Sequence, residues 1–252
     1  SAASDVYKRQ HTYYKNFTKR AAHKSVFSAY TLYLCSVDAQ GDLSRYSYII
    51  SMGAFKLVLL TTPYFFVEEH AILSTLFDEG LELLHMRKPN SEPVYSERLL
   101  SLLPERYRKR IVTHDHFYLK QEFGLKGIHL NQRNTAAPDN YRGQISCTCR
   151  NKEELQQRKK QMDYVFLSPS PDDNQEASSI DQEEELATMG KLIDKKVYAA
   201  GGVTIDNLLQ LKERGFGGAV LYGEVWNRFN IYSNQDYKDL INHFRKLKKI
   251  ID

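Results

Sequence analysis

Two glycine turns follow neighbouring apolar segments in the last quarter of the chain, and their spacing suits the binding of a phosphate group. Gly201 and Gly202 come directly after the apolar run 197–200, and Gly223 follows the run 217–221. Because glycine has no Cβ, backbone N–H groups at such turns can approach an anion closely. The phosphate site of a (β/α)8 barrel is built in this way, after strands seven and eight. The alternative is that the glycines only relieve the backbone between a strand and a helix.

Two basic residues and one carboxylate follow earlier apolar segments. Arg87 and Lys88 combine a planar fork of donors with a mobile point charge, which suits an extended phosphate such as a diphosphate. Asp115 follows the next apolar segment, and a carboxylate that faces a diphosphate implies an intervening Mg2+. The alternatives are a solvated basic pair and, for Asp115, the N-cap of the following helix.

Histidine is concentrated at the ends of three consecutive apolar segments, at His85, at His114 and His116, and at His129. Such residues can serve as general bases near neutral pH, although a histidine in a parallel strand is often only a hydrogen-bonded core residue. The next segment carries Ser146 and a C-x-C pair, Cys147 and Cys149. A zinc site of cysteines needs a second pair, so we expect these thiols to pack inward.

Short apolar segments alternate with amphipathic ones from residue 55 onward, which predicts alternating strands and helices. Eight such units without a second change of composition predict an α/β protein with a single (β/α)8 TIM barrel over residues 52–252. An open doubly wound sheet is the alternative, weakened because no G-x-G-x-x-G follows the first strand. In a barrel the chemistry lies at the carboxyl ends of the strands. The predicted strands are 55–61, 81–87, 110–114, 127–130, 145–148, 163–167, 197–200 and 217–221, and the predicted helices include 67–78, 117–123, 151–162 and 235–250. Asn151 is expected to cap the third of these helices, and Thr204 or Asp206 the helix that follows the first glycine turn.

The first 51 residues differ from the rest. They hold seven Lys or Arg against three Asp, a net charge of +4, whereas the remainder has 28 basic and 28 acidic residues. The body therefore has no basic field of the kind that nucleic acids require, and we expect no nucleic-acid partner. The first methionine is Met52, which favours a leader outside the fold, poorly ordered or extraneous, over an organelle-targeting segment.

The composition points to a globular protein that works in a reducing compartment. Apolar residues make up 42% of the 252 residues and charged residues 26%, which excludes a disordered chain. No apolar run approaches the roughly 20 residues that span a bilayer. Three cysteines provide no disulfide framework, which predicts a cytoplasmic location. The oligomeric state, including a homo-oligomer, stays open.

Taken in order, the motifs at the predicted strand ends resemble those of the thiamine phosphate synthase/TenI superfamily. The resemblance spans Phe55 to Trp226 and depends on order and spacing rather than on one motif. The matching stretches are Arg87, His114-Asp115, Gly127-Ile-His-Leu-Asn-Gln132, Ile145-Ser146, Asp163-Tyr-Val-Phe-Leu-Ser-Pro169 and Ala200-Gly-Gly-Val-Thr-Ile-Asp-Asn207.

The resemblance implies a barrel enzyme of thiamine biosynthesis. The synthase couples 4-amino-2-methyl-5-hydroxymethylpyrimidine diphosphate with thiazole phosphate to give thiamine phosphate and diphosphate, and Mg2+ helps the diphosphate to leave. The resemblance implies that Arg87 holds the diphosphate, that Asp115 binds Mg2+ and that Ser146 contacts the reacting groups. It also implies that Gly201, Gly202 and Gly223 bind the thiazole phosphate.

The chain departs from the family pattern at several of these positions. His85 stands where the family has Gln, His114 where it has Asn, Lys88 one residue before the usual Lys, and Asn134 where it has a second metal-binding Asp. Loss of one of two carboxylates predicts weaker Mg2+ binding. Two other functions therefore stay open. One is a TenI-like thiazole tautomerase, which needs no metal and would use His85 or His114 as its base, and the other is a non-catalytic binder of thiamine intermediates.

Overall fold

A computed structural model describes residues 55–168, 189–230 and 236–252. The leader 1–51, the start of the predicted domain at Met52, the loop from residue 169 to 180 and the helix predicted to begin at Asp181 lie outside these ranges. Within them, no helix combines the length and the apolar character needed to cross a membrane.

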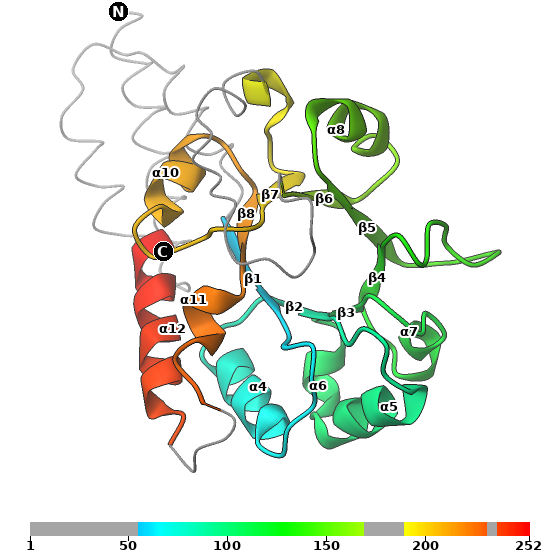
Figure 1. Ribbon diagram of the computed structural model, residues 1–252, viewed down its shortest axis with the longest axis vertical. Coiled ribbons are helices and arrows are strands. Elements are labelled where there is room, and N and C mark those ends of the chain that lie inside the picture. Colours follow the sequence, from blue (N-terminus) through cyan, green and yellow to red (C-terminus); the bar gives the residue numbers. More distant parts are fainter. Residues whose placement is uncertain (1–54, 169–188, 231–235) are drawn as a thin grey trace, which may run out of the picture. The chain divides into compact units, whose positions relative to one another are not determined.

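Eight parallel strands form a closed barrel in sequence order, with the first strand paired to the eighth (Figure 1). Closure confirms the predicted (β/α)8 barrel and excludes the open doubly wound sheet. Each predicted strand is present, with ends that differ from the prediction by at most two residues. The strands are β1 (Lys56–Leu60), β2 (Leu83–Met86), β3 (Ile111–Thr113), β4 (Gly127–Leu130), β5 (Gln144–Cys149), β6 (Tyr164–Leu167), β7 (Val197–Ala199) and β8 (Gly218–Leu221).

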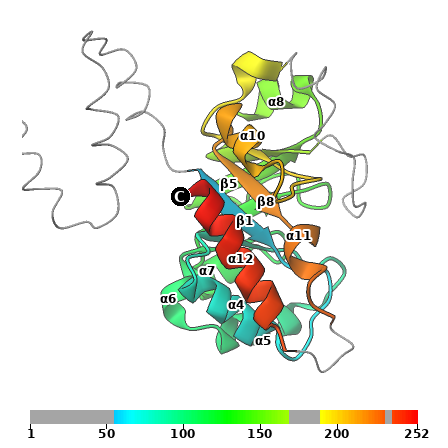
Figure 2. The same ribbon diagram turned by 90° about the vertical axis from the view of Figure 1, so that its left-hand side faces the viewer.

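Helices surround the strands and cover the outer face of the sheet (Figures 1 and 2). The longest of the described helices, α12 (Lys238–Ile251), packs against its neighbours through an apolar face that includes Leu240, Phe244 and Leu247. The other described helices are α4 (Glu69–Asp78), α5 (Pro93–Leu102), α6 (Glu105–Arg108), α7 (Leu119–Glu122), α8 (Lys152–Arg158), α10 (Leu208–Glu213), α11 (Gly223–Trp226) and the 3-10 turn η1 (Gly190–Leu192).

The start of α8 confirms a predicted cap, and the start of α10 corrects another. The Asn151 side chain accepts a hydrogen bond from the backbone N–H of Glu154 (2.9 Å), as expected of an N-cap. Neither Thr204 nor Asp206 caps α10. The N-cap position belongs to Asn207, whose side chain turns back and bonds the preceding loop instead.

Side chains alternate across each strand, which separates two apolar regions. One lies between the sheet and the helices and includes both Cys147 and Cys149, whose thiols are free and buried. The other fills the barrel interior. Because Leu83 on β2 belongs to the interior, the same alternation points His85 and Arg87 toward the barrel axis. The interior residues are Val58, Leu83, Val112, Tyr164, Phe166, Tyr198, Ala200 and Val220.

Candidate active site

Three histidines from neighbouring strands meet inside the barrel. His85 on β2, His114 just after β3 and His129 on β4 are 0%, 5% and 1% exposed. His85 Nδ1 shares a hydrogen bond with His114 Nε2 (2.9 Å), and His85 Nε2 shares one with the Tyr164 hydroxyl (2.7 Å). The strand register thus places residues that are distant in the sequence in one hydrogen-bonded group, which we call the histidine column.

His129 joins the column by stacking on His114, with ring centroids 4.1 Å apart and planes at 17°. Its two ring nitrogens share hydrogen bonds with Ser146 Oγ (2.9 Å) and Thr148 Oγ1 (3.0 Å). Ser146 is completely buried, whereas Thr148, two residues further along the same face of β5, is half-buried. Thr148 did not figure in the sequence prediction, although strand alternation from Ser146 would have identified it.

One ring nitrogen from each histidine lies within 4.8 Å of the other two, a spacing that suggests a metal site. Stacking argues against that interpretation. The nearly parallel rings of His114 and His129 cannot direct their lone pairs at one ion unless a ring turns, and both nitrogens of His129 already have hydroxyl partners.

All three imidazoles are neutral at neutral pH. Burial is the main cause, lowering the pKa of His85 and His114 well below the usual value and that of His129 to about 3. The Arg87 charge further lowers the pKa of both His114 and His129, so this guanidinium lies close to the column. A base of such low pKa is poorly matched to proton abstraction near pH 7.

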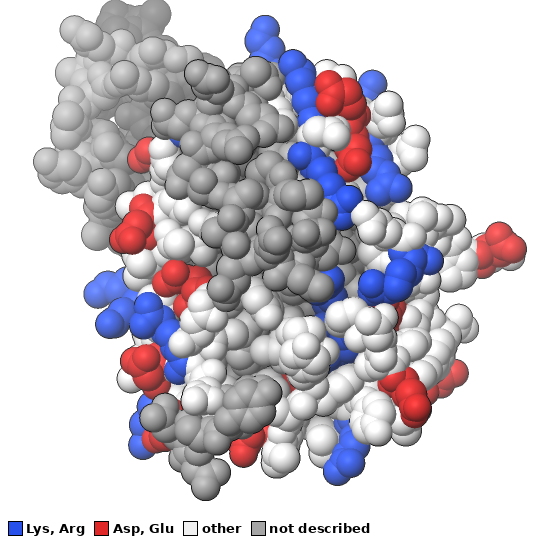
Figure 3. Space-filling model, viewed as in Figure 1, with Lys and Arg blue, Asp and Glu red and all other residues white. Residues whose placement is uncertain are grey.

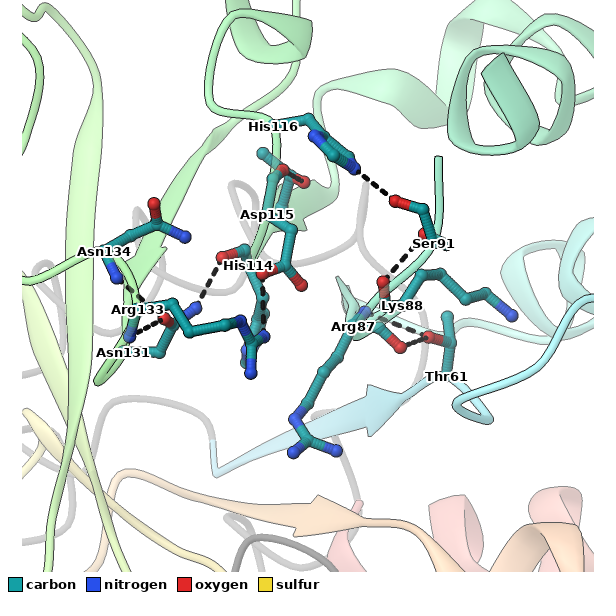
Figure 4. Close-up of polar contacts among 11 residues, drawn as sticks. Thr61, Arg87, Lys88, Ser91, His114, Asp115, His116, Asn131, Arg133 and Asn134 are labelled. Carbon is teal, nitrogen blue, oxygen red and sulfur yellow. Dashed lines mark hydrogen bonds and ion pairs between the residues drawn. The ribbon is translucent and has the colours of Figure 1, made fainter. Parts of the chain in front are cut away.

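Arg87 is held at the carboxyl end of β2 by the neighbouring strand. The Thr61 hydroxyl accepts from the backbone N–H of Arg87 (3.0 Å) and donates to its carbonyl (3.1 Å). The Arg87 side chain extends away from this contact (Figure 4). The predicted position of Arg87 at the strand end is therefore confirmed, while its contact with a diphosphate stays a prediction.

Lys88 lies in a different environment from Arg87. It is 2% exposed, its ammonium forms an ion pair with Glu69 (2.5 Å) and donates to the Tyr64 carbonyl (2.8 Å), and it lies over the Phe65 ring. The alternative that Arg87 and Lys88 form a solvated basic pair is therefore wrong for Lys88. Its buried environment also favours a supporting role, in which Lys88 ties the loop after β1 to β2, over a direct contact with substrate.

Burial dominates the titration of this ion pair. It raises the pKa of Glu69 to about 7 although the Lys88 charge acts in the opposite direction. It likewise lowers the pKa of Lys88, against the effect of Glu69. Both shifts disfavour charge, as expected for a pair removed from water.

Asp115 does not cap a helix, because the following helix α7 has Tyr118 at its N-cap. Its carboxylate instead pairs through Oδ1 with Arg133 Nη2 (2.8 Å), while Oδ2 is buried with no hydrogen-bond partner among the described residues. Arg133 comes from the loop after β4, close to Asn134 (Figure 4). Sequence reasoning did not single out Arg133.

The glycine turns lie side by side, because β7 and β8 are paired. Gly201 and Gly202 have φ values of 81° and 63°, a left-handed conformation that favours glycine. Asn207 fixes this turn by donating to the Gly202 carbonyl (2.8 Å) and accepting from the Thr204 N–H (3.0 Å). Two turns that lack Cβ atoms thus occupy one side of the carboxyl end of the barrel.

Comparison with known proteins agrees with this arrangement. The family model for thiamine monophosphate synthase matches residues 57–225, which is more than half of the chain. The chain belongs to this family. The solved structure of thiamine phosphate pyrophosphorylase from Bacteroides thetaiotaomicron is 52% identical, with 78% of this chain and 97% of that chain covered and a TM-score of 0.71. Membership confirms the resemblance found in the sequence.

More distant structures share the fold alone. Thiamine phosphate pyrophosphorylase from Pyrococcus furiosus is 17% identical, over 78% of this chain and 95% of that one, with a TM-score of 0.59. A 3-hexulose-6-phosphate synthase from Salmonella typhimurium is 13% identical over 78% and 98%, with a TM-score of 0.56. No curated protein matches the chain. Membership of the thiamine monophosphate synthase family supports the conclusion that the chain is an enzyme, a transferase of thiamine biosynthesis that acts on small phosphorylated molecules.

Proposed function

We propose that this family member is a thiamine phosphate synthase, which joins 4-amino-2-methyl-5-hydroxymethylpyrimidine diphosphate to thiazole phosphate. The observation that supports the proposal is that two separate groups of residues suited to binding an anion lie at one end of the barrel. Arg87 and Arg133 lie on the side of β2 to β4, and the glycine turns follow β7 and β8. Two phosphorylated substrates need two such arrangements, whereas a tautomerase of one thiazole phosphate needs one. The name of the 52% identical structure supports the same reaction.

The reaction requires no general base. The bond between the pyrimidine methylene carbon and the diphosphate oxygen breaks, and its electron pair leaves with the diphosphate. The lone pair of the thiazole nitrogen, which carries no proton, then forms the new C–N bond. In this scheme Arg87 compensates the charge of the leaving diphosphate, and the glycine turns hold the thiazole phosphate. Three neutral imidazoles suit this chemistry, because imidazolium ions would repel a pyrimidine cation.

Mg2+ remains a prediction from the family, and the residues present match it only in part. Asp115 offers one buried carboxylate oxygen, Oδ2, without a protein partner among the described residues. Its other oxygen is paired with Arg133, and the second expected ligand is the neutral amide of Asn134. Mg2+ prefers several hard oxygen ligands, so this set does not form a strong metal site.

The tautomerase remains the second candidate. It would need His85 or His114 as a base, but both nitrogens of His85 are hydrogen-bonded inside the barrel and His114 is bonded to it. A non-catalytic binder would keep the anion-binding arrangements without turnover.

The test is formation of thiamine phosphate from the two substrates by the full chain, across a Mg2+ titration. We expect product, and we expect Arg87→Gln to lower kcat/KM by at least about 100-fold, since Arg87 would meet charge that develops in the transition state. The matched control is Arg142→Gln, an exposed arginine before β5, at the amino end of the barrel. Well-folded protein that binds thiazole phosphate but forms no product would refute the synthase. Interconversion of thiazole tautomers by that protein would then identify the tautomerase.

A further inference from the structure

A guanidinium group lies against the carboxylate that the family pattern assigns to Mg2+. Arg133 Nη2 is 2.8 Å from Asp115 Oδ1, in a pair whose side chains are 46% and 13% exposed. The neighbouring position, where the family pattern has a second carboxylate, is the neutral Asn134. The chain therefore carries a fixed positive charge, and one negative charge fewer, at the place expected for a divalent ion.

The backbone that carries Arg133 is fixed by its own turn. The Asn131 side-chain oxygen accepts from the backbone N–H groups of Arg133 (2.9 Å) and Asn134 (3.0 Å). The Asn131 amide nitrogen donates to the carbonyl of His114 (2.6 Å), the residue before Asp115. The loop after β4 is thus attached to the end of β3, which sets the distance between Arg133 and Asp115 independently of their ion pair.

Two guanidinium groups, those of Arg87 and Arg133, lie in the same part of the site (Figure 4). Both side chains extend toward the region between the ends of β2 and β4 (Figure 4). Basic side chains also lie near the centre of the face seen in Figure 1, on the side of β4 and β5 (Figure 3).

We propose that Arg133, together with Arg87, binds the diphosphate group directly and supplies the positive charge that the family pattern assigns to a Mg2+ ion. The proposal deepens the proposed function and rests on it for the identity of the substrate.

Physical chemistry favours this role in three respects. The Arg133 side chain is 46% exposed, so water screens its ion pair with Asp115, and the pair positions Arg133 without holding it away from a ligand. The contact uses one nitrogen of the guanidinium, which has five N–H donors in a planar fork that matches phosphate oxygens. A tethered guanidinium is also present at every turnover, whereas a single carboxylate binds Mg2+ weakly.

The test measures binding of inorganic pyrophosphate to the full chain by calorimetry, in EDTA and in excess Mg2+. We expect binding in EDTA, weakened at least about tenfold by Arg133→Gln, because charge-assisted hydrogen bonds are lost. Arg133→Lys keeps the charge without the fork and should fall between the two. Arg142→Gln, whose side chain is exposed at the other end of the barrel, should bind as the unmodified protein does.

Two results would overturn the proposal. One is binding of pyrophosphate only when Mg2+ is present, and the other is equal affinity of Arg133→Gln and the unmodified protein in EDTA. The synthase assay tests the proposed reaction independently of pyrophosphate binding. Binding in EDTA that depends on Arg133, without any thiamine phosphate formed, would support the anion site and reject the proposed reaction. Product formation with binding that does not depend on Arg133 would reject only the role of Arg133.

Discussion

Lowering the pH from 7 to 5 should destabilise this barrel through its histidine column. His85, His114 and His129 are neutral in the folded protein because burial holds the pKa of each below the usual value. In the unfolded chain the same side chains bind protons below about pH 6.5. At these three residues the unfolded state then holds more protons than the folded state, so their contribution to the free energy of unfolding falls as the pH falls. Glu69, whose raised pKa acts in the opposite direction, offsets part of this loss.

The size of the effect follows from the window between the two pKa values. For His129 the window runs from 6.5 in the unfolded chain down to about 3 in the folded one. A pH of 5 is about 1.5 units below the pKa of the unfolded residue, and each unit lowers the free energy of unfolding by about 1.36 kcal/mol. His129 alone therefore lowers the free energy of unfolding by about 2 kcal/mol at pH 5. His85 and His114 act in the same direction, and a total stability of about 5–15 kcal/mol makes such a loss measurable.

The decisive measurement is the slope of unfolding free energy against pH between pH 5 and 6, from urea denaturation. His85→Gln removes one titrating imidazole but keeps groups that can bond Tyr164 and His114. The slope should decrease by about 1.2 kcal/mol per pH unit, since near pH 5.5 an unfolded histidine is about 90% protonated.

Tyr164→Phe provides the control for this experiment, because it removes a hydrogen bond of His85 and leaves all three imidazoles in place. It should lower stability by about 1 kcal/mol at both pH values without changing the slope. Equal slopes for His85→Gln and the unmodified protein would show that the buried histidine is not neutral and would refute the reasoning.

Three further predictions concern the two anion sites and the buried ion pair. Gly223→Val should weaken binding of thiazole phosphate in calorimetry by about tenfold or more, and unchanged affinity would show that this turn is not part of the site. Gly223 is a better position for the test than Gly202, because the positive φ of Gly202 would strain any side chain introduced there. Asn134→Asp should raise the affinity of the protein for Mg2+ in calorimetry, because it adds a carboxylate beside Asp115; unchanged affinity would show that residue 134 does not contribute to a metal site. Lys88→Met should lower the free energy of unfolding at pH 8 by about 3–5 kcal/mol in urea denaturation, because the Glu69 carboxylate stays buried without its partner. Adding Glu69→Leu should recover much of that loss, and equal losses in the single and double variants would argue against the ion pair.

The sequence determined the fold through local patterns. Most strands are short apolar runs, and several of the described helices between them carry an apolar face, so eight alternating units predicted a closed barrel. The same local reading placed the glycine turns after β7 and β8, and the N-cap at Asn151, because such features depend on a few consecutive residues.

Contacts between distant residues were decided only by the tertiary structure. Arg87 and Lys88 are adjacent in the sequence, yet strand alternation points the first toward the barrel axis while the second is buried against Glu69. Asp115 fits a helix cap or a metal ligand when its segment is considered alone, and its partner proves to be Arg133, 18 residues further along the chain. The histidines likewise form a column only because β2, β3 and β4 pair in one register. A local pattern specifies on which face of a helix or strand a residue lies. Closure of the barrel specifies which distant residue that side chain contacts.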